Sequence, residues 1–212
     1  MTEISKLESL IGKPVSEWNK EDIQKLYSDN AEEMRYFNVL SEVISRNKSE
    51  DVYLLIAPRI QQILFNDALQ KCTKLLEKYQ NKSNKESAEK LKSELLNVVE
   101  NDRNYFYRLL ALSLALRYFK SVDKFKLDYI QEIMNLAVKS TLSINFIDHL
   151  ELCSEIMTEI IYPARISYFK SFGIDLFTKE LLGIINKYEE YLNLLAEKIS
   201  SGIKESTEEH QQ

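Results

Sequence analysis

The chain has 212 residues, enough for one large domain or for a domain with a smaller appendage. With 33 acidic and 28 basic residues its net charge is −5, which disfavours bulk attraction to nucleic acid or anionic lipid but is compatible with a local basic stripe. Hydrophobic residues make up 44% of the chain, well above the disordered range, while four glycines and three prolines supply few tight turns. The composition therefore excludes a disordered chain and disfavours a sheet-based fold.

Neither the cysteines nor the N-terminal residues indicate an exported protein. Cys72 and Cys153 form neither a disulfide framework nor a metal-site spacing, and we expect both thiols in the core. The residues after Met1 contain no apolar signal segment, and no apolar run approaches the roughly 20 residues of a membrane span. The sequence thus predicts a cytoplasmic protein without membrane association.

The first third of the chain predicts three helices. A short one over Thr2 to Ile11 stops at Gly12, whose missing side chain suits a helix end. The second runs from Lys20 to Arg46, because its apolar residues keep helical spacing and its first turn is acidic. Pro58 is expected in the first turn of the third, which continues to about Gln80.

The stretch from Asn84 to Lys120 is predicted as one long central helix. Asn84 is a good N-cap, and no glycine or proline interrupts the chain before Pro163. Apolar residues follow a helical period along it, with Asp102 as a polar exception. Residues 109–116 are apolar nearly all round, so other helices are expected to cover this part on every side.

The remaining residues also favour helices. We expect one over Phe125 to Lys139 and another over Asn145 to Tyr162, kinked or restarted at Pro163 and stopped at Gly173. A last helix is expected to end near residue 199. The predicted fold is all-α, a bundle of six or seven helices around the long central one, without a sheet. A helical core domain (1–140), a C-terminal helical part packed on or beside it (141–200) and a disordered acidic tail (201–212) are the expected divisions.

Catalytic constellations are largely missing from the sequence. His210 lies in the tail, and His149 could act as a base beside Asp148 or Glu151, but no nucleophile motif or second histidine accompanies it. The sequence also lacks a glycine-rich phosphate loop and a Glu-x-x-His pair for metal. We therefore predict a non-enzyme without a metal or an organic cofactor, with His149 on a helix surface.

Basic residues gather along the second half of the predicted central helix. They are Arg103, Arg108, Arg117, Lys120 and Lys124. The last three are three and four residues apart, so they share a face if the helix continues. Tyrosines lie between them, and basic residues interleaved with aromatics can bind single-stranded nucleic acid or a protein partner. In the alternative interpretation, the cations only complement the helix dipole while the aromatics pack.

Aromatic residues are dense near the C-terminal end of the chain. Candidates for a protein interface are Tyr168, Phe169, Phe172 and Phe177. Aromatics beyond the needs of the core can mark such an interface. Their helical spacing is equally typical of core packing.

The stretch from Ala57 to Phe125 resembles the helical domain of GINS subunits, non-enzymatic components of the archaeal and eukaryotic replicative helicase assembly. The aromatic and leucine run of that family looks like residues 101–110. Its Arg-x-x-Lys-apolar signature looks like residues 117–122, which read Arg-Tyr-Phe-Lys-Ser-Val and have one residue inserted before the apolar position. The resemblance implies a role in DNA replication and other helical subunits as partners. GINS subunits also carry a small β domain, whereas the pattern after Ser140 is helical.

These observations predict a non-catalytic α-helical scaffold or adaptor in a cytoplasmic multi-protein assembly, with protein partners in a hetero- or homo-oligomer. The GINS resemblance would place that assembly in DNA replication. The alternative is a helical protein that binds nucleic acid through the five basic residues. Nucleic acid is thus a secondary partner in the prediction.

Overall fold

A computed structural model describes residues 2–82, 84–119, 127–142, 148–175 and 179–209 of the protein. The helices are, in chain order, α1 (Glu3–Ile11), α2 (Lys20–Asp29), α3 (Phe37–Arg46), α4 (Glu50–Tyr79), α5 (Lys85–Asn101), α6 (Tyr105–Tyr118), α7 (Leu127–Leu142), α8 (Leu150–Ile156), α9 (Tyr162–Phe172) and α10 (Lys179–Glu209). Short 3-10 turns at Val15–Glu17 and Glu33–Arg35 and a π-helical turn at Met157–Ile161 complete them. No strand occurs in these ranges, so the all-α prediction is confirmed.

Local capping sets the ends of the first helices. The side chain of Thr2 accepts a hydrogen bond from the Ser5 backbone N–H, and Gly12 ends α1 in the left-handed conformation. Asn19 and Asp22 form a capping box at the start of α2. The predicted helix over Lys20 to Arg46 is wrong as one element, because it divides into α2 and α3 around a 3-10 turn.

The segment between α2 and α3 explains that division. Ser28, Asp29 and Asn30 are short polar residues that compete with helical hydrogen bonds, and α2 ends there. Met34, in the 3-10 turn, is fully buried, so the break itself contributes a side chain to the cluster of α1–α3.

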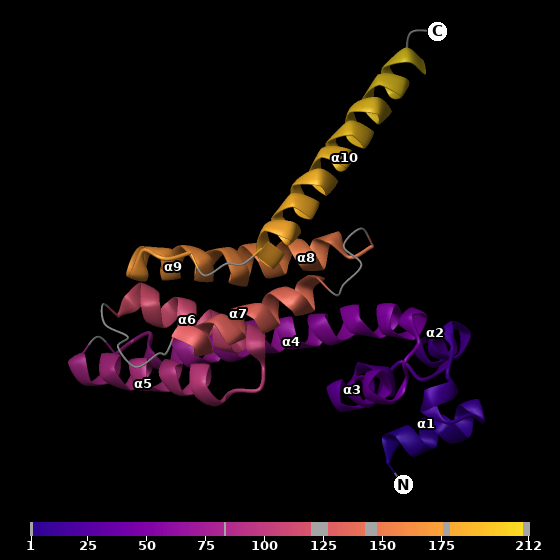
Figure 1. Cartoon of the computed structure of the whole chain (residues 1–212), viewed down its shortest axis with the longest axis horizontal. Helices are drawn as coiled ribbons and strands as arrows, with labels where there is room; N and C mark the ends of the chain where they lie inside the picture. The colour runs from indigo at the N-terminus through magenta and orange to yellow at the C-terminus, as the bar shows by residue number, and fades with distance from the viewer. Residues whose placement is uncertain (1, 83, 120–126, 143–147, 176–178, 210–212) are drawn as a thin grey trace.

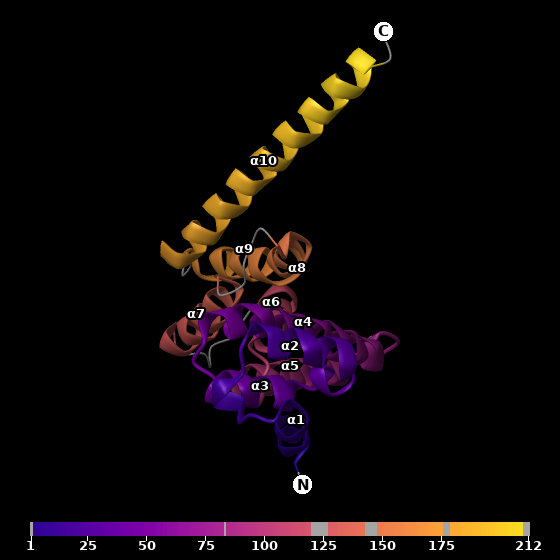
Figure 2. The same ribbon diagram turned by 90° about the vertical axis from the view of Figure 1, so that its right-hand side faces the viewer.

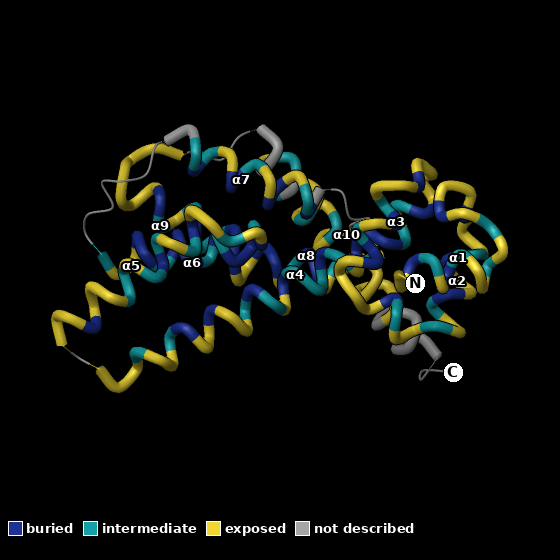
Figure 3. Tube along the Cα trace, turned by 90° about the horizontal axis from the view of Figure 1, so that it is seen from below, coloured by how far each residue is buried: buried dark blue, intermediate teal, exposed yellow. Residues whose placement is uncertain are grey.

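Helix α4 joins two clusters of buried side chains. Val52 and Ile56 belong to the cluster of α1–α3, while Phe65, Ala68 and Cys72 belong to the cluster around α6. At about 1.5 Å per residue this helix is roughly 45 Å long, enough to reach both. It begins at Glu50, so Pro58 lies inside the helix and not in its first turn as predicted. Figure 3 shows α1–α3 and the α5–α6 pair at opposite ends of the molecule.

The predicted central helix from Asn84 to Lys120 is not continuous. Asp102 adopts an extended conformation that ends α5, and its side chain accepts a hydrogen bond from the Asn104 backbone N–H. Asn104 then caps α6 by accepting from the N–H groups of Phe106 and Tyr107. The two polar residues thus replace the missing helical hydrogen bonds and turn the chain, so α5 and α6 pack against each other.

Helix α6 is enclosed, as its all-round apolar sequence predicts. It packs against α4, α5, α7 and α9. Leu109, Ala111, Leu112 and Ala115 have no solvent exposure, and its other leucines are at least partly buried. Figure 1 shows α8 and α9 as a layer above α6 and α7, with α4 and α5 below.

Helices α8 and α9 form one helical rod with the π turn between them. Pro163 has no backbone N–H and cannot bond one turn back, and the wider π turn just before it absorbs this irregularity. The rod ends at Gly173, in the left-handed conformation, as predicted. Its buried residues, which include Cys153 and Ile160, share the cluster around α6, whereas those of α1–α3 form a second cluster with the first part of α4.

Helix α10 leaves this layered body and projects away from it (Figures 1 and 2). It continues to Glu209, beyond the predicted end near residue 199, so residues 201–209 are helical and not the disordered tail that we expected. The polar, glutamate-rich composition of this end is compatible with a solvated helix.

Candidate protein interface

The outward side of α9 is apolar. Ile166, Phe169 and Phe172 are 52%, 55% and 43% exposed, while Tyr168 is 1% exposed and faces the core. The centroids of the Tyr168 and Phe172 rings lie 4.7 Å apart, so the exposed Phe172 ring packs against the buried Tyr168 ring. Of the predicted interface residues, Phe169 and Phe172 are therefore on the surface, Tyr168 is a core residue, and Phe177 lies outside the described residues.

Neighbouring contacts fix the position of this face. The Arg165 Nε donates to the Asp175 Oδ2 at 3.0 Å, which holds the chain after Gly173 against α9. Arg165 and Lys170 are the charged residues of α9, which contains no acidic residue. We call Ile166, Phe169 and Phe172, with these two cations, the α9 face.

A second apolar surface runs along α10. Ile185, Tyr188, Leu192, Leu195 and Ile199 follow one another at intervals of three and four residues, which places them in one row of the helix. The start of this row is anchored: Ile185 packs against the central core and the Tyr188 hydroxyl lies 3.0 Å from the Ser154 hydroxyl. Beyond the anchor, Leu192, Leu195 and Ile199 are 40%, 36% and 56% exposed. We call these three residues the α10 row.

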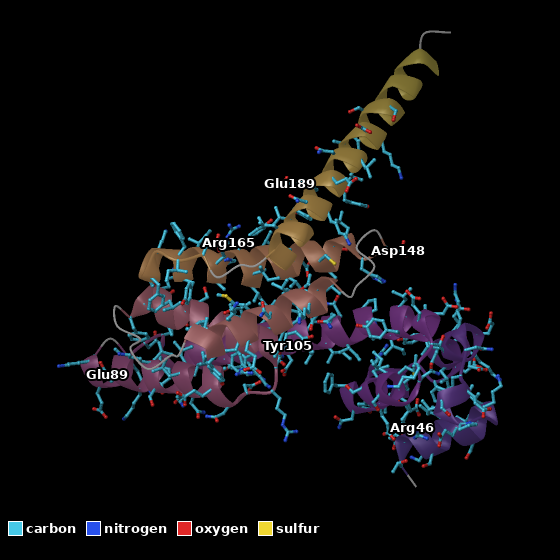
Figure 4. The ribbon with its side chains drawn as sticks, in the orientation of Figure 1. Arg46, Glu89, Tyr105, Asp148, Arg165 and Glu189 are labelled. Atoms are coloured by element: carbon cyan, nitrogen blue, oxygen red, sulfur yellow. The ribbon has the colours of Figure 1, made fainter. Side chains whose placement is uncertain are left out.

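Figure 4 shows how the two surfaces relate. Arg165 lies on α9 and Glu189 on α10, where α10 leaves the body. The α10 row begins just after Glu189 and so lies on the projecting part of the helix. Sequence reasoning missed Ile166 and the whole α10 row, although the alternating intervals of three and four could have revealed that row.

The predicted basic residues are not gathered on one helix face. Arg103 lies exposed in the break between α5 and α6, and Arg117 lies exposed near the other end of α6, roughly 20 Å further along. Lys120 and Lys124 lie outside the described residues. The continuous helix that would have aligned them is interrupted at Asp102.

Arg108 has a structural role. Its Nε donates to the Val99 carbonyl at 2.8 Å, its Nη2 donates to the Tyr129 hydroxyl, and its guanidinium lies 5.0 Å from the centre of the Tyr129 ring. The Tyr129 hydroxyl is also 2.6 Å from the Glu100 carbonyl. This pair therefore satisfies carbonyl groups at the end of α5 and ties them to α7.

A cleft between α6 and α9, lined in part by apolar residues of both helices, brings Arg117 together with a further cation, Lys170. Arg117 and Lys170 line it together with Ser113, Ser167 and Ser171. The Ser113 and Ser167 hydroxyls lie 3.3 Å apart. Cations beside hydroxyl groups are suited to an anionic ligand. Lys170 was not among the predicted basic residues because it lies far from the others in sequence.

His149 lines a separate hollow between α2, α4 and α8. Tyr27, Arg59 and Gln62 contribute to this hollow. Burial raises the pKa of Tyr27 to about 12, and its hydroxyl donates to the Leu55 carbonyl at 3.3 Å, so this phenol is not an activated nucleophile. Among the residues that the structure describes, no group of three or more His, Cys, Asp or Glu side chains could hold a metal ion.

Comparisons of the chain with protein-family models, with curated proteins and with solved structures find no match. Across the described ranges, no helix combines the length and the apolar character that a bilayer crossing requires.

Proposed function

We propose that the chain is a non-catalytic α-helical scaffold or adaptor subunit of a cytoplasmic multi-protein assembly. The observation that carries this proposal is the exposure of large apolar side chains on two neighbouring helices, α9 and α10. Clustered aromatic and aliphatic side chains that stay exposed in a folded chain are typical of protein interfaces.

The distribution of exposed groups supports a role in binding and not in catalysis. The exposed apolar side chains of α9 and α10 offer contact area for a partner, whereas catalysis needs a concave site with an activated nucleophile or base. His149 shares its hollow with Tyr27, whose phenol is not an activated nucleophile. The helical body then serves to hold α9 and α10 in place.

Partner capture from native cells tests this proposal. Phe169 and Phe172 are both changed to glutamate in a tagged chain, and co-purifying proteins are quantified by mass spectrometry. Loss of a specific partner is expected because a charge replaces an apolar anchor in the interface. Leu10→Glu on α1 is the control, since Leu10 is equally exposed but lies on the opposite end of the protein. An unchanged partner list for the double variant would contradict the proposed α9 interface.

The resemblance to GINS subunits extends this proposal to the DNA replication machinery. It rests on residues 101–110 and 117–122, of which residues 120–122 lie outside the described part. Against it, the described residues after Ser140 are helical and do not form the β domain that the resemblance implies. Recovery of replicative helicase subunits with the tagged chain is the expected result, and their consistent absence removes this extension while leaving the scaffold proposal intact.

A second candidate function is binding of nucleic acid, which the cleft between α6 and α9 favours. Arg117 and Lys170 would contact phosphates there, and affinity would then fall steeply with salt. Fluorescence anisotropy with a single-stranded oligonucleotide measures this, and Arg117→Glu with Lys170→Glu should abolish binding. Arg35→Glu, at an exposed cation remote from the cleft, is the matched control. Equal binding by all three proteins would exclude the cleft as the site.

A further inference from the structure

The α9 face and the α10 row are both apolar, and the helices that carry them differ in net charge. Each is a strip of apolar side chains along one helix, and two such strips can pack side by side. Helix α9 carries two basic residues and no acidic one, whereas residues 189–209 of α10 carry six acidic and two basic residues. The two helices thus carry opposite net charge, which favours their association, with Lys170 as the cation of α9 outside the Arg165–Asp175 ion pair.

The α10 row is prevented from reaching the α9 face of its own chain. Ile185 and Tyr188 hold the first part of α10 against the body, and Leu192 is only one turn further along. Between Gly183 and Gly202 the helix contains neither glycine nor proline, so it has no residue at which to bend back. Any α9 face that the projecting part contacts therefore belongs to a different molecule.

We propose that this molecule is a second copy of the chain, and that two copies form a symmetric dimer in which α10 of each packs on α9 of the other. This inference rests on the proposed binding role of the two surfaces and names their partner. A two-fold axis makes the exchange reciprocal, because each copy supplies one row and one face, and the closed pair leaves neither strip exposed.

The area available fits such a dimer. Three exposed side chains on α9 and three on α10 contribute from each copy. Their burial in both copies removes on the order of 1,000 Å² of apolar surface, which is near the minimum of a specific interface before the flanking residues are counted. Pairing the two α10 rows alone buries only half of these side chains and leaves both α9 faces exposed.

Light scattering after size exclusion, at micromolar protein concentrations, tests the dimer. The intact chain should have twice its mass of 24.9 kDa. Leu192→Glu on the α10 row and Phe169→Glu on the α9 face should each weaken association roughly tenfold or more, because each places a charge in a buried contact. Circular dichroism should be unchanged, since both residues are exposed in the single chain.

Two controls match these variants. Leu194→Glu changes a leucine that is 50% exposed on the same helix but lies about 160° around it from Leu192, so the dimer should persist. Ser171→Glu places the same charge on an exposed position of α9 outside its apolar strip, with the same expectation.

A mixing experiment isolates the exchange itself. Leu192→Glu retains an intact α9 face and Phe169→Glu retains an intact α10 row, so a mixture of the two can form one of the two reciprocal contacts. At a protein concentration at which each variant alone is monomeric, the mixture of the two should associate. Dimers of Phe169→Glu alone would overturn the proposal in favour of direct pairing of α10 rows, and a monomeric intact chain would overturn any self-association. Neither result affects the capture of another protein by the α9 face, which the Phe169 and Phe172 double variant tests separately.

Discussion

Helices α6 and α10 are both rich in leucine, yet their surroundings are opposite. In α6 the apolar residues point in every direction, and four other helices cover them. In α10 five apolar residues from Ile185 to Ile199 form one row, the first part of which meets the body while the rest projects from it, and Leu194 lies on the opposite side. An all-round apolar sequence thus requires a full set of neighbours within the chain, whereas a single row requires one partner, which another molecule can supply.

The largest expected effect lies in α6. Leu112→Ala should destabilise the protein by about 2–5 kcal/mol, because it leaves a cavity in a packed core from which a leucine with no exposure has been removed. Urea unfolding followed by circular dichroism measures this. A loss below about 1 kcal/mol would mean that α6 is not enclosed as described.

The joint between α5 and α6 should be the next most sensitive position. Besides capping α6, Asn104 donates through Nδ2 to the Leu64 carbonyl at 2.7 Å and to Asp67 at 3.0 Å. Asn104→Ala removes all of these bonds and should cost about 2–3 kcal/mol. Asn104→Asp keeps the cap but loses the donor and places a second carboxylate beside Asp67. Its loss of unfolding free energy should therefore be no smaller than that of the alanine variant. Wild-type stability in the alanine variant would contradict the role of this residue.

The pH dependence of the unfolding free energy should reflect the burial of two thiols in the cluster around α6. Burial raises the pKa of Cys72 to about 11 and that of Cys153 to about 12, from an ordinary value near 9. Below pH 9 both thiols are neutral in the folded and unfolded states, so stability is unaffected. Above pH 9 only the unfolded chain ionises, and stability should fall by about 1.4 kcal/mol per pH unit for each thiol until the folded pKa is reached.

The double variant Cys72→Ala with Cys153→Ala tests whether the two thiols cause the alkaline loss of stability. Alanine is preferred to serine because serine would bury two hydroxyl groups. In this variant the alkaline loss in urea unfolding should be smaller than in the intact chain. An identical pH dependence would show that other groups account for the loss.

The smallest effect on folding is expected on α10. Leu195→Ala should change the unfolding free energy of the single chain by less than about 0.5 kcal/mol, because this side chain is exposed and its truncation leaves no buried cavity. Measurement at protein concentrations low enough to keep the chain monomeric is essential to the contrast with Leu112. A loss similar to that of Leu112→Ala would place the α10 row inside a folded core.

The sequence predicts the candidate protein interface only in part. Phe169 and Phe172 were recognised from aromatic density, but the same signal also selected Tyr168, which is buried, because aromatic residues serve cores and interfaces alike. Arg108 was grouped with surface cations, although its contacts with Val99 and Tyr129 make it structural. Such contacts join residues far apart in sequence, and a linear pattern does not reveal them.

By itself the sequence determined the helical class, the caps at Gly12, Asn84 and Gly173, and the enclosure of residues 109–116, because hydrogen-bonding groups and helical periodicity act within a few residues. Only the tertiary structure decided that the chain turns at Asp102 and Asn104, that α4 joins two cores, and that the row on α10 extends past the body. Each of these depends on which helix lies beside which, and the free energy of that packing comes from surfaces that meet across the whole chain.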